Sequence, residues 1–240
     1  AELLVAKYSE YEPRKYSSSG LYHIITNIDF RMDDERNSLK TLIVVLAKLV
    51  QTLIEKAQVF KFRYLMRIAK RFGECTEEIG AKSAIKSALK TISEYLAAQI
   101  TPKDDQIKHF PFLIEAINLN FKECVKECFR SLVNAIAKLI ILKEDTFLQL
   151  IEVSVMIDLA VAFDFFRRKG DEDKVRMQQA IWSIANAVST KIKNNSLRTV
   201  TPNCAILVHI FGACKGYDKN ENEKLKLACV MMAEKVKHYK

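Results

Sequence analysis

Glycine and proline are scarce in this sequence, which holds six Gly and four Pro in 240 residues. Both residues interrupt regular structure, and a fold of many short strands joined by tight turns needs more of them. Apolar residues instead recur at helical spacing along almost the whole chain, and strict alternation is nowhere sustained. The sequence therefore predicts an all-α protein whose helices are joined by short links and lie antiparallel to their neighbours.

Long apolar runs are also missing. No run reaches the roughly 18 residues that a membrane-spanning helix needs, and no signal peptide is recognisable. Hydrophobic residues make up 49% of the chain and charged residues 28%, which is typical of a globular rather than a disordered protein. We expect a cytoplasmic protein that has no membrane partner.

The cysteines follow no CxxC pattern and lie mostly inside apolar helical runs. Cys124 and Cys128 are one helical turn apart and could present two thiolates on one face. A zinc site would need two more ligands, and no His stands at a matching spacing. The pattern favours buried free thiols in a reducing compartment, and it predicts neither a metal nor a cofactor. The six cysteines are at positions 75, 124, 128, 204, 214 and 229.

Catalytic patterns are absent as well. The sequence has no Ser/His/Asp order, no nucleophile elbow and no glycine-rich phosphate loop. His109, His209 and His238 are isolated in the sequence. We therefore expect a protein that is not an enzyme.

Positive charge is present in excess, with a formal net charge of +9. Such a surplus, spread over a chain, often serves only solubility, but it also allows a nucleic-acid-binding surface. The strongest candidate is one cationic strip on a helix, with Tyr64 beside it. This basic strip consists of Arg63, Arg67, Lys70 and Arg71. It is either an anion-binding or nucleic-acid-binding surface or the solvated face of a long helix, and the second interpretation is favoured.

The helices expected from the periodicity fill most of the chain. A linker is predicted at residues 15–20. A very long or kinked helix is predicted from the Asp33–Asp34 cap to a stop at Gly73, and the next helix is predicted to start at Thr76. Further helices are predicted at 130–142, 144–170, 171–193 and 220–240, and the first of these is either separate from the preceding helix or continuous with it. The fold class is thus all-α, with about nine or ten antiparallel helices.

Several stretches have the order and spacing of one known family. They are "DDERNSL" from Asp33, "TISEYL" from Thr91, "IKHFPFLIEAINLNFKECV" from Ile107 and "VSVMIDLAVAFDFF" from Val153. Together they resemble the 14-3-3 family, and nearly the whole chain can be laid alongside that family with short insertions and deletions. The resemblance implies a single helical domain over residues 1–240, of which 218–240 would be an extra C-terminal helix.

The resemblance also implies a function. Members of the family are cup-shaped helical homodimers that act as adaptors, and each subunit binds a phosphoserine or phosphothreonine peptide in a groove. A dianionic phosphate in such a groove needs several fixed cations, usually including Arg. The partners expected for this chain are therefore protein or phosphoprotein segments and a second copy of itself.

The phosphate-binding positions of the family are mostly substituted in this chain. Counting from "ERN", the two cationic positions of the third helix fall on Val44 and Gln51, with Lys48 between them. The Arg-Tyr pair of the family falls on Asn120 and Phe121. The Asn that holds the peptide backbone falls on Asp158, and Val161 occupies an apolar groove position. We therefore expect an adaptor whose binding of phosphorylated peptides is weak or lost; the alternative is a basic helical scaffold that binds nucleic acid.

Overall fold

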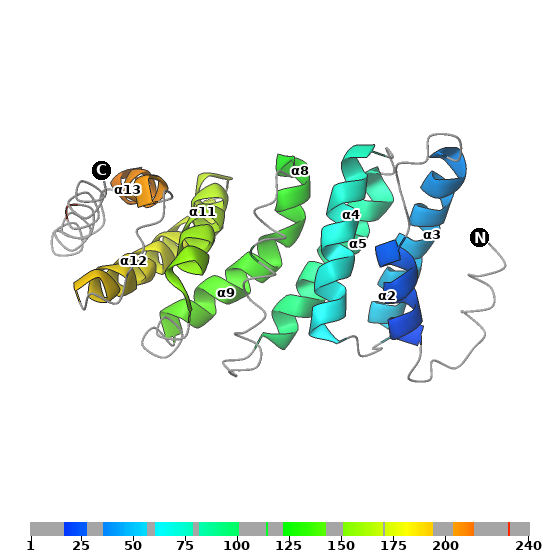
Figure 1. Ribbon diagram of the computed structural model, residues 1–240, viewed down its shortest axis with the longest axis horizontal. Coiled ribbons are helices and arrows are strands. Elements are labelled where there is room, and N and C mark those ends of the chain that lie inside the picture. The colour runs from blue at the N-terminus through cyan, green and yellow to red at the C-terminus, as the bar shows by residue number, and fades with distance from the viewer. Residues whose placement is uncertain are drawn as a thin grey trace. The chain divides into compact units, whose positions relative to one another are not determined.

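The computed structural model describes most of the chain, and every regular element in that part is a helix, with no strand among them (Figure 1). The described residues are 17–27, 36–56, 61–78, 82–100, 114, 122–142, 151–169, 171–193, 204–213 and 230. The prediction of an all-α protein is confirmed for these residues. The expected number of helices and the cup-like arrangement stay predictions.

The chain divides into two compact units, one of Ala1–Gln99 with Leu119–Leu132 and one of Ile100–Asn118 with Val133–Lys240. The described elements of the first unit are α2 (Ser17–Asn27), α3 (Arg36–Glu55), α4 (Phe62–Glu78), α5 (Lys82–Gln99), α8 (Glu123–Lys126) and the 3₁₀ turn η2 (Glu127–Phe129). The second unit holds most of α9 (Arg130–Leu142), together with α11 (Val153–Lys169), α12 (Asp171–Lys193) and α13 (Cys204–Ala213). A single domain over 1–240 stays a prediction.

The core of the first unit is built from the apolar faces of its helices. On α4 the buried residues include Leu65, Ile68, Ala69, Phe72 and Cys75. Their spacing of three and four residues places them on one side of the helix. This side allows α4 to pack against α2 and α5, while α5 also packs against α3 and η2. The opposite side of α4 carries the exposed Arg63 and Arg67.

The second unit is centred on α11, which packs against α12 and α13. Phe163 and Phe166 of α11 are fully buried, as are Ile181 and Ile184 of α12. Figure 1 shows α11 and α12 side by side, in yellow-green and yellow. Burial of large apolar side chains on both helices is what stabilises this pair.

The long helix predicted from Asp33 to Gly73 is wrong, because the structure has two helices there. Helix α3 ends at Glu55, Lys56 lies in a turn, and α4 begins at Phe62. Gly73 does not stop a helix either, since it is buried inside α4. A single glycine in a helix interior costs about 1 kcal/mol relative to alanine, which packing on two sides can offset.

Three other predicted boundaries differ from the structure. Thr76 lies in the last turn of α4, and the following helix begins at Lys82. The linker predicted at 15–20 is helical from Ser17 onward, where α2 starts. The helix predicted at 144–170 is helical from Val153 to Lys169, with Ile151 in a bend before it. The bounds predicted for 130–142 and 171–193 are confirmed by α9 and α12.

Some predicted features lie outside the described residues. They are Asn120, Phe121, His109, His238, the Asp33–Asp34 cap and the extra helix at 218–240 except for Val230. None of the described helices combines the length and the apolar character that a membrane span requires.

Candidate functional site

Helix α3 presents the first group of predicted site residues on one side. Val44 and Gln51 are half-buried and Lys48 is exposed. Their spacing of four and three residues corresponds to neighbouring positions along one helix side. Lys48 is the only basic residue between Thr41 and Glu55. This part of α3 therefore offers a single cation.

Gln51 is held by a neighbouring helix. Its Nε2 donates a hydrogen bond to Oγ of Ser87 on α5 over 2.8 Å. Both groups are neutral, so this contact links α3 to α5 without adding charge to the surface. The resemblance in the sequence predicts that this position matches a cation of the 14-3-3 family, and the chain has there an amide that already donates to Ser87.

Helix α11 carries the second group of predicted site residues. Asp158 and Val161 are both half-buried there, three residues apart. They belong to the second unit, whereas Val44, Lys48 and Gln51 belong to the first. Each group is thus placed within its own unit, and the groove expected from the family resemblance stays a prediction.

The basic strip divides into two kinds of residue. Arg63 and Arg67 are exposed, while Lys70 and Arg71 are half-buried. Nη1 of Arg71 forms an ion pair with Oε2 of Glu74 over 2.9 Å. Nη1 of Arg67 donates a hydrogen bond to the hydroxyl of Tyr22 on α2. Arg67 and Arg71 of the basic strip therefore have partners within the unit.

A cation–aromatic cluster formed by Tyr22, His23, Lys61, Tyr64 and Arg67 joins α2 to the start of α4. The rings of Tyr22 and Tyr64 stack with centroids 4.6 Å apart and planes 19° apart. The Arg67 guanidinium carbon lies 5.9 Å from the Tyr22 ring centroid, and Nζ of Lys61 lies 5.7 Å from that of Tyr64. These are distances at which a cation is attracted by an aromatic face.

Sequence reasoning missed most of this cluster. It placed Tyr64 beside the basic strip, but it left residues 21–30, which contain Tyr22, ambiguous between helix and strand. The signal available was the run Leu21, Tyr22, Ile25, whose spacing suits the buried side of a helix, and all three are buried. The pairing of that helix with α4 could not be read from spacing alone.

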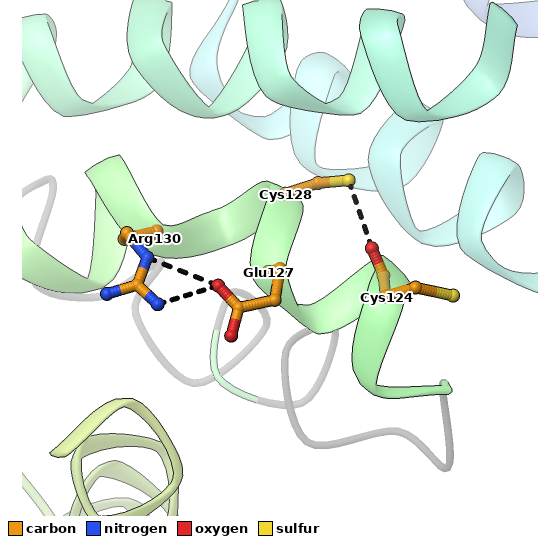
Figure 2. Close-up of polar contacts among 4 residues, drawn as sticks. All are labelled: Cys124, Glu127, Cys128 and Arg130. Atoms are coloured by element: carbon orange, nitrogen blue, oxygen red, sulfur yellow. Dashed lines mark hydrogen bonds and ion pairs between the residues drawn. The ribbon is translucent and has the colours of Figure 1, made fainter. Parts of the chain in front are cut away.

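The structure corrects the interpretation of one cysteine pair as buried thiols. Cys75 is buried, but Cys124 is exposed and Cys128 is half-buried. Figure 2 shows the two side chains one turn apart, with the Cys128 sulfur near the Cys124 carbonyl oxygen. Beside them Nη2 of Arg130 forms an ion pair with Oε2 of Glu127 over 2.8 Å. Burial raises the pKa of the Cys128 thiol from its ordinary 9.0, and the Lys86 ammonium on α5 partly opposes this effect.

Metal ligands do not gather in the part of the chain that the structure describes. No group of three His, Cys, Asp or Glu side chains lies close enough there to hold an ion. His209 is exposed on α13.

Comparison with known protein families, with curated proteins and with solved structures gives no match for this chain. The class of protein that the structure defines is an all-helical protein, and the resemblance to 14-3-3 proteins depends on the motifs of the sequence alone.

Proposed function

We propose that this protein is a non-catalytic adaptor, similar to 14-3-3 proteins, which binds segments of partner proteins without requiring a phosphate on them. The observation that carries the proposal is the Gln51–Ser87 hydrogen bond of 2.8 Å, at a position where phosphate recognition needs a cation. Lys48 alone is a weak phosphate site, because an exposed single charge gains little in water and phosphate recognition normally combines several charge-assisted donors.

Calorimetry with matched peptides tests this proposal. A generic phosphoserine peptide and its unphosphorylated twin are titrated into the full chain. We expect affinities for the two that differ by less than about threefold, or less than about 0.7 kcal/mol. A micromolar or tighter Kd that depends on the phosphate would contradict the proposal.

A gain-of-function variant asks whether the positions on α3 are the ones that matter. Val44→Lys combined with Gln51→Arg restores two cations on the same helix side as Lys48, and phosphate-dependent binding is expected to appear. The matched control is Val45→Lys combined with Thr52→Arg. It adds the same charges on a helix side rotated by about 100° and is expected to have no such effect. Equal gains in the two variants would show that net charge alone is responsible.

The proposal has two further features. One, which comes from the family resemblance, is a homodimer; sedimentation at high protein concentration tests it, and a clean monomer mass would contradict it. The other is a cytoplasmic location, which the pattern of cysteines in the sequence favours because free thiols are typical of a reducing compartment.

A second candidate function is nucleic-acid binding by the surface of α4. The exposed Arg63 and Arg67 and the neighbouring tyrosine stack support it, because cations interleaved with aromatic rings are typical of single-strand binding. The partners of Arg67 and Arg71 within the unit count against it, since a cation that already has a partner gains less from a phosphate.

A further inference from the structure

Two thiols with different exposure lie one helical turn apart in the first unit. Cys124 is on α8 and is exposed, whereas Cys128 is on η2 and is half-buried. Nothing in the proposed adaptor function uses either thiol. An exposed thiol beside a second, protected one is the arrangement in which one cysteine reacts first and the other resolves the product.

The side chain of Cys128 already contacts the backbone of Cys124. The Cys128 thiol donates to the carbonyl oxygen of Cys124, with a sulfur–oxygen distance of 3.5 Å (Figure 2). Helical geometry puts Cα atoms four residues apart at about 6 Å, within the range that a disulfide spans. Cβ atoms at this spacing are about 5–6 Å apart, while a disulfide needs about 4 Å. Bridging the two sulfurs therefore requires this turn to tighten.

The local structure limits such a change to the start of α8. Helix α8 has only four residues, and the 3₁₀ turn η2 follows it directly. The residue at its N-cap, Lys122, makes no side-chain capping hydrogen bond. The buried side chains of Val125 and Phe129 hold the rest of this stretch in place, so the bridge forms by movement of the uncapped first turn, where Cys124 lies.

The environment of the sulfurs sets the order of reaction. Burial raises the pKa of Cys128, the Cys124 and Glu127 side chains raise it further, and Lys86 on α5 lowers it. Cys128 is therefore a protonated thiol at neutral pH. Cys124 reaches solvent, so a reagent meets this sulfur first.

We propose that Cys124 and Cys128 form a redox-active dithiol site that reacts with low-molecular-weight disulfides such as oxidised glutathione. The Cys124 thiolate attacks one sulfur of the reagent, which breaks its S–S bond and releases one thiolate. Cys128 then loses its proton and attacks the Cys124 sulfur, which releases the second thiolate. Two protein thiols are oxidised to one disulfide, and one reagent disulfide is reduced to two thiols.

Trypsin provides a direct readout. Cleavage after Lys122, Lys126 and Arg130 separates the two cysteines into the tetrapeptides Glu123–Lys126 and Glu127–Arg130. After treatment of the full chain with oxidised glutathione, acid quenching and digestion, mass spectrometry is expected to find these two tetrapeptides joined by a disulfide. The peptide that carries the buried Cys75 is an internal comparison and should retain its thiol.

Two serine variants separate the roles of the cysteines. Cys128→Ser is expected to stop at the mixed disulfide, so that glutathione stays on the Glu123–Lys126 peptide. Of this pair, Cys124→Ser leaves the half-buried Cys128 thiol, whose reaction we expect to be slower by about tenfold or more.

The proposal is overturned if each native tetrapeptide carries its own glutathione, or if both remain thiols while the reagent is in excess. It is also overturned if Cys128→Ser fails to accumulate glutathione on Cys124. None of these readouts involves peptide binding, so they test the dithiol site independently of the adaptor function.

Discussion

Asp164 is the most buried carboxylate in the described part of the chain, with 6% of its surface exposed. It accepts hydrogen bonds from Nη2 and Nε of Arg167 at 2.6 and 3.2 Å, and it forms an ion pair with Nη2 of Arg168 at 2.6 Å. All three residues are near the end of α11, where positive charge also complements the helix dipole. The two arginines thus compensate the desolvation of one carboxylate.

Removal of this carboxylate is expected to destabilise the second unit. Asp164→Ala leaves Arg167, whose side chain is only 12% exposed, without its partner. Breaking a largely buried pair in this way costs roughly 3 kcal/mol. The single tryptophan of the chain, Trp182, lies on α12 in the same unit, so its fluorescence during urea unfolding reports the change.

Arg168→Ala is the matched control, because the side chain of Arg168 is 54% exposed. Its ion pair is screened by water, and its loss should cost less than about 1 kcal/mol. If both variants lower the free energy of unfolding equally, the burial of the Asp164–Arg167 pair does not determine how much it contributes to stability.

Two serines on α5 offer a second comparison at the scale of single residues. Ser93 is fully buried, and its hydroxyl accepts a hydrogen bond from the backbone N–H of Leu132 over 3.2 Å. Ser87 accepts from Gln51 at an exposed position. Ser93→Ala is expected to lower the free energy of unfolding by about 1–2 kcal/mol. Ser87→Ala should change it by less than about 0.5 kcal/mol.

Circular dichroism during urea unfolding measures both serine variants, and Trp182 fluorescence shows whether the second unit is affected. A larger loss of stability for Ser87→Ala than for Ser93→Ala would contradict the assignment of these two contacts.

Neither contact could be predicted from the sequence. Gln51 and Ser87 are 36 residues apart, and periodicity predicts that both stand on helices but not that the helices meet.

At the scale of elements, helix existence was more predictable than helix ends. The bounds of α9 follow from apolar periodicity, and those of α12 from apolar periodicity together with an acidic N-terminus. The break between α3 and α4 was missed because residues 56–61, "KAQVFK", contain no Gly or Pro, so the sequence gives no breaker signal there. Gly73 is a helix breaker and Thr76 was predicted to start the next helix. Both lie inside α4, because the packing of α4 outweighs these local preferences.

Gly20 offers a test of local preference within α2. A Cβ added at this position would meet nothing within 4 Å, and the residue lies inside the helix. Gly20→Ala therefore gains helix propensity without a clash, and we expect it to stabilise the first unit by about 0.5–1 kcal/mol. Urea unfolding followed by circular dichroism measures this gain, and a net loss would show that α2 depends on the absence of a side chain there.

At the scale of the whole molecule, the two candidate functions differ in how they use charge. An adaptor that binds apolar or unphosphorylated segments gains its affinity from apolar burial, which salt barely weakens. A nucleic-acid-binding protein releases counterions, and its affinity falls steeply with salt. The net charge of +9 is compatible with both, so the decisive question is whether binding depends on particular cations.

Removing two exposed cations from α4 answers this question. Arg63→Ala combined with Arg67→Ala is compared with Lys138→Ala combined with Lys174→Ala, which removes two charges from other exposed positions. We expect both double variants to weaken the binding of a single-stranded oligonucleotide equally. The reason is that the Arg67 guanidinium already donates to the Tyr22 hydroxyl and lies near the Tyr22 ring. Fluorescence anisotropy over a series of salt concentrations measures the affinities.

The opposite outcome would favour nucleic-acid binding. Each phosphate contact on a single strand contributes about 0.7 to the slope of log K against log salt. If Arg63 and Arg67 each held a phosphate, their removal would reduce that slope by about 1.4, while the lysine variant would leave it unchanged. Since Arg67 also bridges α2 and α4, circular dichroism must first show that the variant retains its helices. If the slope changes in the folded arginine variant and not in the lysine variant, the basic strip is a nucleic-acid-binding surface. Nucleic-acid binding would then be better supported than the adaptor function.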